Sequence, residues 1–291
     1  MVVAVPAVPG PEPELERTRD MTWETTEGLV APEVAFDFSG QVVLVTGGTR
    51  GIGRGIVEAF RAAGALVVAC GRQRPPDGWV DHDNLRFFAL DVRSAEAAPE
   101  AVAAATGHFG RLDVLVNNAG GSPPADAANA SPRFSQAIVD LNLMGPLHLA
   151  QAANAVMQTQ DSGGSIVNIT SISGLRPSPG TAAYGAAKAG LINLTQSLAI
   201  EWAPKVRLNC ISAGLVATEA ADDHYGGVEG MAEVAATVPL GRFGTPADVA
   251  GMCLLLASPW ASYVTGANLV VHGGGERPAF LQAAERSHGA P

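Results

Sequence analysis

The sequence predicts an α/β protein built on a doubly wound parallel sheet in a single domain. From Gln41 onward, short apolar runs alternate with longer segments of helical periodicity. The apolar runs are continuous, which is typical of parallel strands that are covered by helices on both faces. A glycine-rich turn follows the first run and precedes a helix, as in doubly wound folds that bind nucleotides.

Seven apolar runs are predicted to be the strands of this sheet. They are Val42–Thr46, Ala65–Cys70, Leu85–Leu90, Leu112–Asn117, Ser165–Ser171, Val206–Ser212 and Ala267–Val271. Helices are expected at 52–63, from a cap at Ser94 to 106, at 132–159, on a segment that carries Tyr184 and ends near 202, and at 246–257.

The domain is expected to span residues 37–276. The N-terminal extension, residues 1–36, is rich in proline and has no sustained period, which predicts a loosely attached segment with room for a short helix around 14–23. Residues 277–291 form a C-terminal tail. The first residues lack the basic segment of a signal peptide.

Composition excludes several classes of partner. The chain of 291 residues carries a net charge of −10, which disfavours nucleic acid and anionic membranes. No apolar run reaches the ~18 residues that span a bilayer. Cys70, Cys210 and Cys253 lie in apolar runs, which predicts reduced, buried thiols in a cytoplasmic protein. The histidines lack the spacing of metal ligands, so no metal site is expected.

Tyr184 and Lys188 are four residues apart, a spacing that places two side chains on one face of a helix. An ammonium beside a phenol favours the phenolate, and a cationic cofactor ring would add to this effect. Together they predict a Tyr184 pKa below its ordinary value of ~10 and a role in proton transfer. Ser171 ends a predicted strand, where its hydroxyl could hold the substrate oxygen with which Tyr184 would exchange a proton. A surface Tyr and Lys on an alanine-rich helix would show the same spacing, so the pair needs further support.

That support comes from three other motifs in a fixed order. TGGTRGIG spans Thr46–Gly53, NNAG spans Asn117–Gly120, and Ser171 precedes the Tyr184/Lys188 pair. From about Phe38 to Glu276, the chain therefore resembles the short-chain dehydrogenase/reductase family in its single-domain form. The resemblance implies four catalytic residues: Asn142, Ser171, Tyr184 and Lys188. In these roles Asn142 helps to hold a water, Ser171 orients the substrate, Tyr184 exchanges a proton, and Lys188 lowers the pKa of Tyr184 and binds the nicotinamide ribose.

The glycine turn is predicted to bind a dinucleotide. Glycines here permit a tight turn and a close approach of the backbone to a pyrophosphate, and the following helix offers unpaired N–H groups. The end of the second strand carries Gly71 and Arg72 without a carboxylate. Together with Arg50, Arg72 matches the family's NADP pattern, because both can pair with a 2′-phosphate. We therefore expect NADP(H) as cofactor.

The resemblance extends the expected cofactor site along the chain. Asp91 would contact the adenine, Val92 would flank its ring, and Asn117 could be chiefly structural. The full expected set is Gly47, Thr49, Arg50, Gly51, Ile52, Gly53, Arg72, Asp91, Val92, Asn118, Ala119, Gly120, Tyr184, Lys188, Gly214, Val216 and Thr218. Ala213 replaces the family's usual proline, which predicts a less constrained loop at this point. His272, where an acidic residue is frequent, is expected to be structural or to contact another subunit.

The substrate is less well defined by the sequence. Residues 215–240 are predicted to form a substrate lid, hinged at Gly226 and Gly227, whose carboxylates, including Glu219, would disfavour polyanionic substrates. Leu175, Pro177, Tyr225 and Met231 predict an apolar lining, and hence an uncharged carbonyl compound or secondary alcohol. Two alternatives remain: a 3-oxoacyl-thioester reductase acting on acyl carrier protein or coenzyme A, and a non-catalytic NADP-binding scaffold.

Apolar residues on two long helices predict assembly. The stripes comprise Ile138, Leu141, Leu149 and Val156, and Ala183, Ala187, Leu191, Leu194, Leu198 and Trp202. In related proteins such helices pair about a twofold axis, which predicts a homotetramer. The alternative is that these residues face the core of a single chain.

Overall fold

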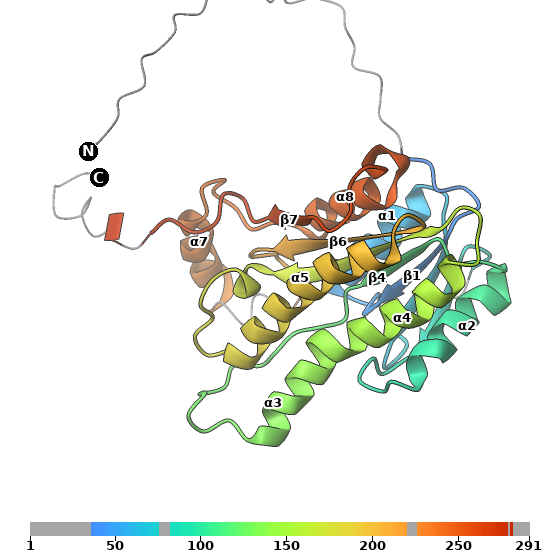
Figure 1. Ribbon diagram of the computed structural model, residues 1–291. Coiled ribbons are helices and arrows are strands. Elements are labelled where there is room, and N and C mark those ends of the chain that lie inside the picture. The colour runs from blue at the N-terminus through green and yellow to red at the C-terminus, as the bar shows by residue number, and fades with distance from the viewer. Residues whose placement is uncertain (1–35, 76–81, 220–225, 279, 282–291) are drawn as a thin grey trace, which may run out of the picture. The chain divides into compact units, whose positions relative to one another are not determined.

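The computed structural model describes residues 36–75, 82–219, 226–278 and 280–281 (Figure 1). Ala35–Pro291 form one compact unit. Two sequence-based expectations, the short helix at 14–23 and the role of Tyr225, lie outside the described residues.

A parallel sheet of seven strands forms the centre of the fold, in the order β3-β2-β1-β4-β5-β6-β7. The strands are β1 (Val42–Thr46), β2 (Leu66–Gly71), β3 (Leu85–Ala89), β4 (Val114–Asn117), β5 (Gly164–Ser171), β6 (Val206–Ala213) and β7 (Asn268–Val271). The order reverses between β1 and β4, where ligands bind in sheets of this kind. The predicted doubly wound fold is confirmed.

Helices cover both faces of the sheet, as the continuous apolar strands predict. They are α1 (Gly51–Ala62), α2 (Ala97–Phe109), α3 (Pro132–Val139), α4 (Gly145–Met157), α5 (Ala182–Trp202), α7 (Gly227–Thr237) and α8 (Pro246–Ala257). A π-helical turn η1 (Asp140–Met144) joins α3 to α4, and 3₁₀ turns form at η2 (Ile172–Gly174) and η3 (Pro259–Ala261).

The side chains of β1 point alternately into two hydrophobic cores, one on each face of the sheet. Val43 and Val45 pack with α1 and α8, whereas Val42 and Leu44 pack with α2, α4 and α5. Successive side chains of a strand point to opposite faces, so one buried strand serves both cores. Figure 1 shows α2, α4 and α5 along the same side of the sheet.

Most predicted boundaries agree with the structure within one or two residues, but one expectation about a helix cap is wrong. Ser94 does not cap a helix: its hydroxyl donates to Glu96 Oε2 at 3.0 Å, and α2 begins only at Ala97. The predicted lid contains a helix of 11 residues, α7. Gly226 is the N-cap of α7, with a φ of 81°, and Gly227 begins the helix, with a φ of 75°. Both values lie in the left-handed region that favours glycine.

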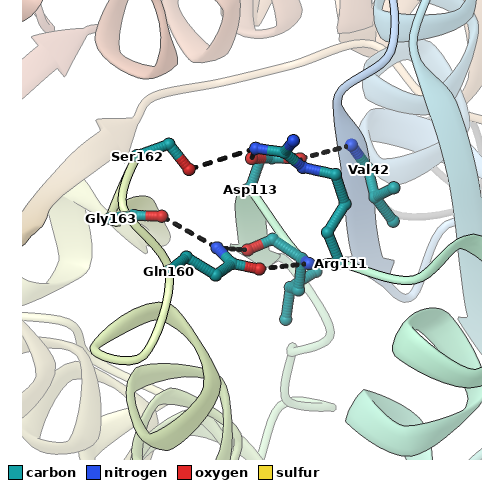
Figure 2. A network of polar contacts seen from close by, with 7 residues as sticks. Val42, Arg111, Asp113, Gln160, Ser162 and Gly163 are labelled. Atoms are coloured by element: carbon teal, nitrogen blue, oxygen red, sulfur yellow. Dashed lines mark hydrogen bonds and ion pairs between the residues drawn. The ribbon is translucent and has the colours of Figure 1, made fainter.

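A polar network fixes the sheet at the edge where β1 and β4 begin (Figure 2). Asp113 Oδ2 accepts from the Val42 N–H at 2.9 Å and from Arg111 Nε at 2.8 Å, and its Oδ1 accepts from Arg111 Nη2 at 2.6 Å. Arg111 also donates to Ser162 Oγ at 3.0 Å. Gln160 bonds both backbone groups of Leu112 and the Gly163 carbonyl. The carboxylate of Asp113 thereby joins β1, β4 and the turn before β5.

We expect Asp113→Asn to lower the free energy of unfolding by about 1–3 kcal/mol, because an amide NH₂ would face donors that now share a buried carboxylate. Urea denaturation measures the change. The matched control is Glu58→Gln, which breaks the exposed Arg61–Glu58 pair and should have little effect. Equal stabilities of the two variants would contradict the structural role of Asp113.

Candidate active site

The glycine turn between β1 and α1 lies at the point where the strand order reverses. Gly47 and Gly51 have φ of 60° and 51°, in the region that favours glycine. A Cβ on Gly53 would overlap the Gly47 carbonyl, and one on Gly47 would lie 3.0 Å from Ala119 Cα. The backbone is therefore bare and tightly folded where a pyrophosphate would approach.

Thr46 and Asn118 lock this turn to the NNAG segment after β4. Thr46 Oγ1 accepts from the N–H groups of Asn118 and Ala119, each at 3.0 Å. Asn118 Nδ2 donates to the carbonyls of Thr46 at 2.9 Å and Gly47 at 3.1 Å. Two predicted cofactor segments thus form one rigid unit, in which Asn118 has a structural role.

The start of α1 already binds an anion. The Gly51 N–H donates to the Glu219 carboxylate, with N–O distances of 3.1 and 3.4 Å. The first turn of α1 contains no acidic residue, and Arg50 at the N-cap makes no side-chain cap bond. The bare glycine turn and this carboxylate show that the site fits an anionic group such as a pyrophosphate.

Arg72, directly after β2, and Arg50, at the N-cap of α1, are both exposed. Gly71 lies under Thr49, so that a Cβ on it would be 3.0 Å from Thr49 Cγ2. Asp91 is bound by Arg93, whose hydrogen bonds are the largest cause of its lowered pKa. The side chain of Val92 is 7% exposed and belongs to the core on the α2 face. The Asp91 side chain is still 39% exposed, so the contacts of Asp91 and Val92 with an adenine stay a prediction.

The structure brings three predicted catalytic residues together at the end of β5. Lys188 is 3% exposed, and its Nζ donates to the Ile169 carbonyl at 2.9 Å. The same Nζ lies 5.7 Å from the centroid of the Tyr184 ring. Ser171 is hydrogen-bonded to Tyr184, and its Oγ accepts from the Ser173 N–H at 3.1 Å.

The protein's own groups raise the pKa of Tyr184. Burial is the largest cause, and the hydrogen bond with Ser171 opposes it. Burial also lowers the pKa of Lys188 to about 8. The lowering expected from Lys188 together with a cationic cofactor ring stays a prediction for the complex with the cofactor.

Asn142 lies in the π-helical turn η1 and is fully buried. Its Oδ1 accepts from the Gly121 N–H, and its Nδ2 donates to the carbonyls of Gly121 and Ile138, all at 2.9 Å. Gly120 fits between Asn142 and Lys188: a Cβ on it would lie 2.7 Å from Asn142 Oδ1 and 3.1 Å from Lys188 Nζ. Asn142 thus satisfies backbone groups beside Lys188, and its predicted role in holding a water stays a prediction.

A chain of buried side chains holds α5 in place, and sequence reasoning missed most of it. Asn117 Nδ2 donates to Asn168 Oδ1, and Asn168 Nδ2 donates to Thr195 Oγ1, both at 2.9 Å. Thr195 Oγ1 donates to the Leu191 carbonyl at 2.7 Å. Asn117 also donates to the Pro146 carbonyl, so it has the structural role foreseen. The available signal was an asparagine in the middle of the apolar run of β5.

Backbone hydrogen bonds anchor the chain directly after β6. Ala213 ends β6 and pairs with both neighbouring strands. Gly214 N–H donates to the Val271 carbonyl, and Ala217 N–H to the Gly244 carbonyl, each at 2.9 Å. A Cβ on Gly214 would lie 2.6 Å from His272 Cβ. These contacts hold residues 214–217, and the effect of Ala213 in place of proline stays a prediction.

The predicted substrate residues are less clearly gathered. Leu175 is 50% exposed and Pro177 is exposed after η2, while Met231 is half-buried on α7. A cavity of about 80 Å³ lies beside the start of α5 and is lined by Ser122, Phe134 and Ala183 among others. The sequence did not point to the residues that line this cavity. The Ala125 N–H donates to the Gly180 carbonyl at 2.8 Å and joins two of the lining segments.

Residues 47–276 match the family model described as enoyl-(acyl carrier protein) reductase. L-fucose dehydrogenase of Bos taurus is 36% identical over 247 residues, covering 82% of this chain and 90% of that protein. A solved short-chain dehydrogenase/reductase of Brucella melitensis, described as a glucose/ribitol dehydrogenase, superposes with a TM-score of 0.77 at 31% identity, covering 84% of this chain and 99% of its own.

The chain belongs to the short-chain dehydrogenase/reductase family. The structure of ElxO with NADP bound also resembles it, with a TM-score of 0.75 and 31% identity over 80% of this chain and 98% of that one. Members of this family are oxidoreductases that use nicotinamide cofactors and act on alcohol or carbonyl groups. The residues gathered at the ends of β1, β4 and β5 are the motifs by which the sequence resembled the family.

The described residues contain no helix with the length and apolarity needed to cross a membrane. They also contain no group of three or more His, Cys, Asp or Glu side chains placed to hold a metal ion. Cys70, Cys210 and Cys253 are free and buried, and burial raises the pKa of each thiol.

The buried Lys188 predicts a pH dependence of stability. Its pKa is about 8 in the folded protein and ~10.4 in an unfolded chain, so between these values the unfolded state binds more protons and stability rises with pH. We expect the unfolding free energy of the wild type to rise by about 1–2 kcal/mol between pH 8 and 10 relative to Lys188→Met. Urea denaturation at both pH values measures this difference.

Lys205 is exposed and provides the matched control. Lys205→Met should follow the wild type over the same interval. If Lys188→Met and the wild type gave parallel pH profiles, the folded lysine would titrate like an unfolded one, and the assigned burial would be wrong.

Proposed function

We propose that the protein is an NADP(H)-dependent oxidoreductase that interconverts a carbonyl and a secondary alcohol, with Tyr184 as the acid/base. The observation that carries this proposal is the convergence of Ser171, Tyr184 and Lys188 beside the glycine turn. Ser171 is hydrogen-bonded to Tyr184, and Lys188 Nζ is held near the ring by Ile169. A bound nicotinamide would supply or accept the hydride.

The residues of the chain direct the substrate oxygen and its proton. Ser171 and Tyr184 form a pair of hydroxyl groups that can bind one oxygen between them. The phenol of Tyr184 can donate its proton as a carbonyl becomes an alcohol, and the phenolate can accept a proton in the reverse direction.

Preference for NADP(H) rests on two arginines. Arg72 is exposed directly after β2, Arg50 is exposed at the N-cap of α1, and Gly71 offers no carboxylate to the ribose. Two arginines suit a 2′-phosphate, whereas an acidic side chain would repel it. The resemblance to a protein whose structure holds NADP supports the same choice.

For the substrate we propose an uncharged compound of moderate size. The exposed Leu175 provides an apolar surface after Ser171, and similarity to a dehydrogenase of L-fucose supports a small hydroxylated substrate. The description of the matching family model favours a second candidate, a reductase of acyl thioesters. Turnover of NADPH with a panel of simple carbonyl compounds and acyl-coenzyme A thioesters discriminates the two.

Part of the apolar surface that predicted a homotetramer is not exposed in the structure. Ile138, Leu149, Ala187, Leu191 and Leu198 are buried within the single chain, as the alternative interpretation held. Ile200 on α5 is 82% exposed and Trp260 is 72% exposed, so apolar surface remains for a partner. The tetramer and the cytoplasmic location stay predictions.

We expect Tyr184→Phe to lower kcat for reduction by at least about a hundredfold while leaving the Kd for NADPH nearly unchanged, because it removes the proton donor and conserves packing. Stopped-flow turnover and fluorescence titration measure the two quantities. Near wild-type turnover by the variant would exclude Tyr184 as the acid.

We expect Arg72→Gln to weaken NADPH binding by about tenfold or more and NADH binding little, because one charged contact to the 2′-phosphate is lost. Calorimetry with both cofactors measures the ratio. Arg133→Gln, at the exposed start of α3, is the control. A wild type that prefers NADH would overturn the assignment. Gly71→Asp is a poorer test, since its Cβ would press on Thr49.

A further inference from the structure

The carboxylate of Glu219 occupies the N-terminus of α1, although 168 positions separate it from Gly51 in the sequence. The Gly51 N–H is one of the groups that a helix start leaves without a partner in the helix. Glu219 is exposed, so burial does not force its side chain to this place. A carboxylate that is distant in the sequence therefore satisfies a donor that α1 itself leaves open.

The surrounding chain delivers Glu219 to this position. The parallel bridge between Val216 and Gly244 and the bond from the Ala217 N–H to the Gly244 carbonyl anchor the preceding residues. Thr218 packs over the turn, where a Cβ on Gly51 would lie 3.2 Å from its Cγ2. A fixed backbone up to Thr218 leaves the Glu219 side chain within reach of one N–H group, the one at the glycine turn.

The same donor suits a dinucleotide pyrophosphate. A phosphate oxygen and a carboxylate oxygen cannot both take the single hydrogen of Gly51 in good geometry, and two anions at one helix start repel each other. We infer that Glu219 is an intramolecular competitor of the cofactor's pyrophosphate, so that its side chain must leave the glycine turn before the cofactor binds. This inference rests on the proposed function, because it takes the glycine turn as the cofactor site.

The competition makes Glu219 a residue that sets cofactor affinity. Part of the binding free energy is used to break the contact between Glu219 and Gly51, and the carboxylate that stays nearby repels the phosphates. Both effects weaken binding of any dinucleotide, whether or not it carries a 2′-phosphate. Glu219 therefore acts on NADPH and NADH alike, unlike Arg72, which distinguishes them.

The test is calorimetric titration of the full-length wild type, Glu219→Gln and Glu219→Ala with NADPH and with NADH. We expect both variants to bind each cofactor about three- to tenfold more tightly. Glu219→Asp, which keeps the charge on a shorter side chain, should lie between them and the wild type. Glu229→Gln, an acidic residue in the first turn of α7, is the matched control and should bind as the wild type does.

Each other result overturns the inference. Equal affinity of the wild type and both variants would mean that the Glu219 contact persists beside the cofactor. Weaker binding would mean that Glu219 contributes to the cofactor site. Tighter binding by Glu219→Gln alone would reveal a new bond from its amide to phosphate. If the wild type bound neither dinucleotide, the proposed function would fail and this inference with it.

Discussion

The buried ammonium of Lys188 is the constraint on which the rest of the site depends. A charged group that is 3% exposed costs several kcal/mol unless its surroundings accept hydrogen bonds from it. The Ile169 carbonyl accepts one such bond from Nζ, which ties the lysine to β5. Gly120 leaves the space that Nζ needs, and Asn142 lies on the other side of the same glycine. Three separate segments of the chain thus converge around one atom.

The same constraint explains the polar side chains beneath α5. The helix must place Tyr184 and Lys188 to within a fraction of an ångström for proton transfer, and apolar packing alone lets a helix slide. The chain from Asn117 through Asn168 to Thr195 replaces sliding contacts by directional bonds between β4, β5 and α5. Buried hydrogen bonds are costly to break individually, so they hold one arrangement.

Much of the fold could be predicted from the sequence, because strand runs such as Val42–Thr46 are apolar throughout and the helices between them are periodic. The candidate catalytic residues could be proposed from the sequence because their spacing is local or tied to a strand end. The contact of Glu219 with Gly51 could not, since it joins residues far apart through a loop whose course no local pattern encodes. The raised pKa of Tyr184 in the protein without cofactor could not be predicted either, because burial depends on the packed structure. The cap at Ser94 failed because its hydroxyl binds the nearby Glu96 side chain instead.

The π-helical turn η1 has a consequence for how this chain can change in length. A π turn holds one residue more than the α-helical turn it replaces, so α3 and α4 are out of register by that residue. Deleting any one residue of Asp140–Met144 would restore a regular helix and rotate α3 relative to α4 by about 100°. Asn142 would then leave Gly121, and the cavity wall that α3 forms through Phe134 would turn away from α5. The number of residues in this turn is therefore under stronger constraint than the identity of most of them.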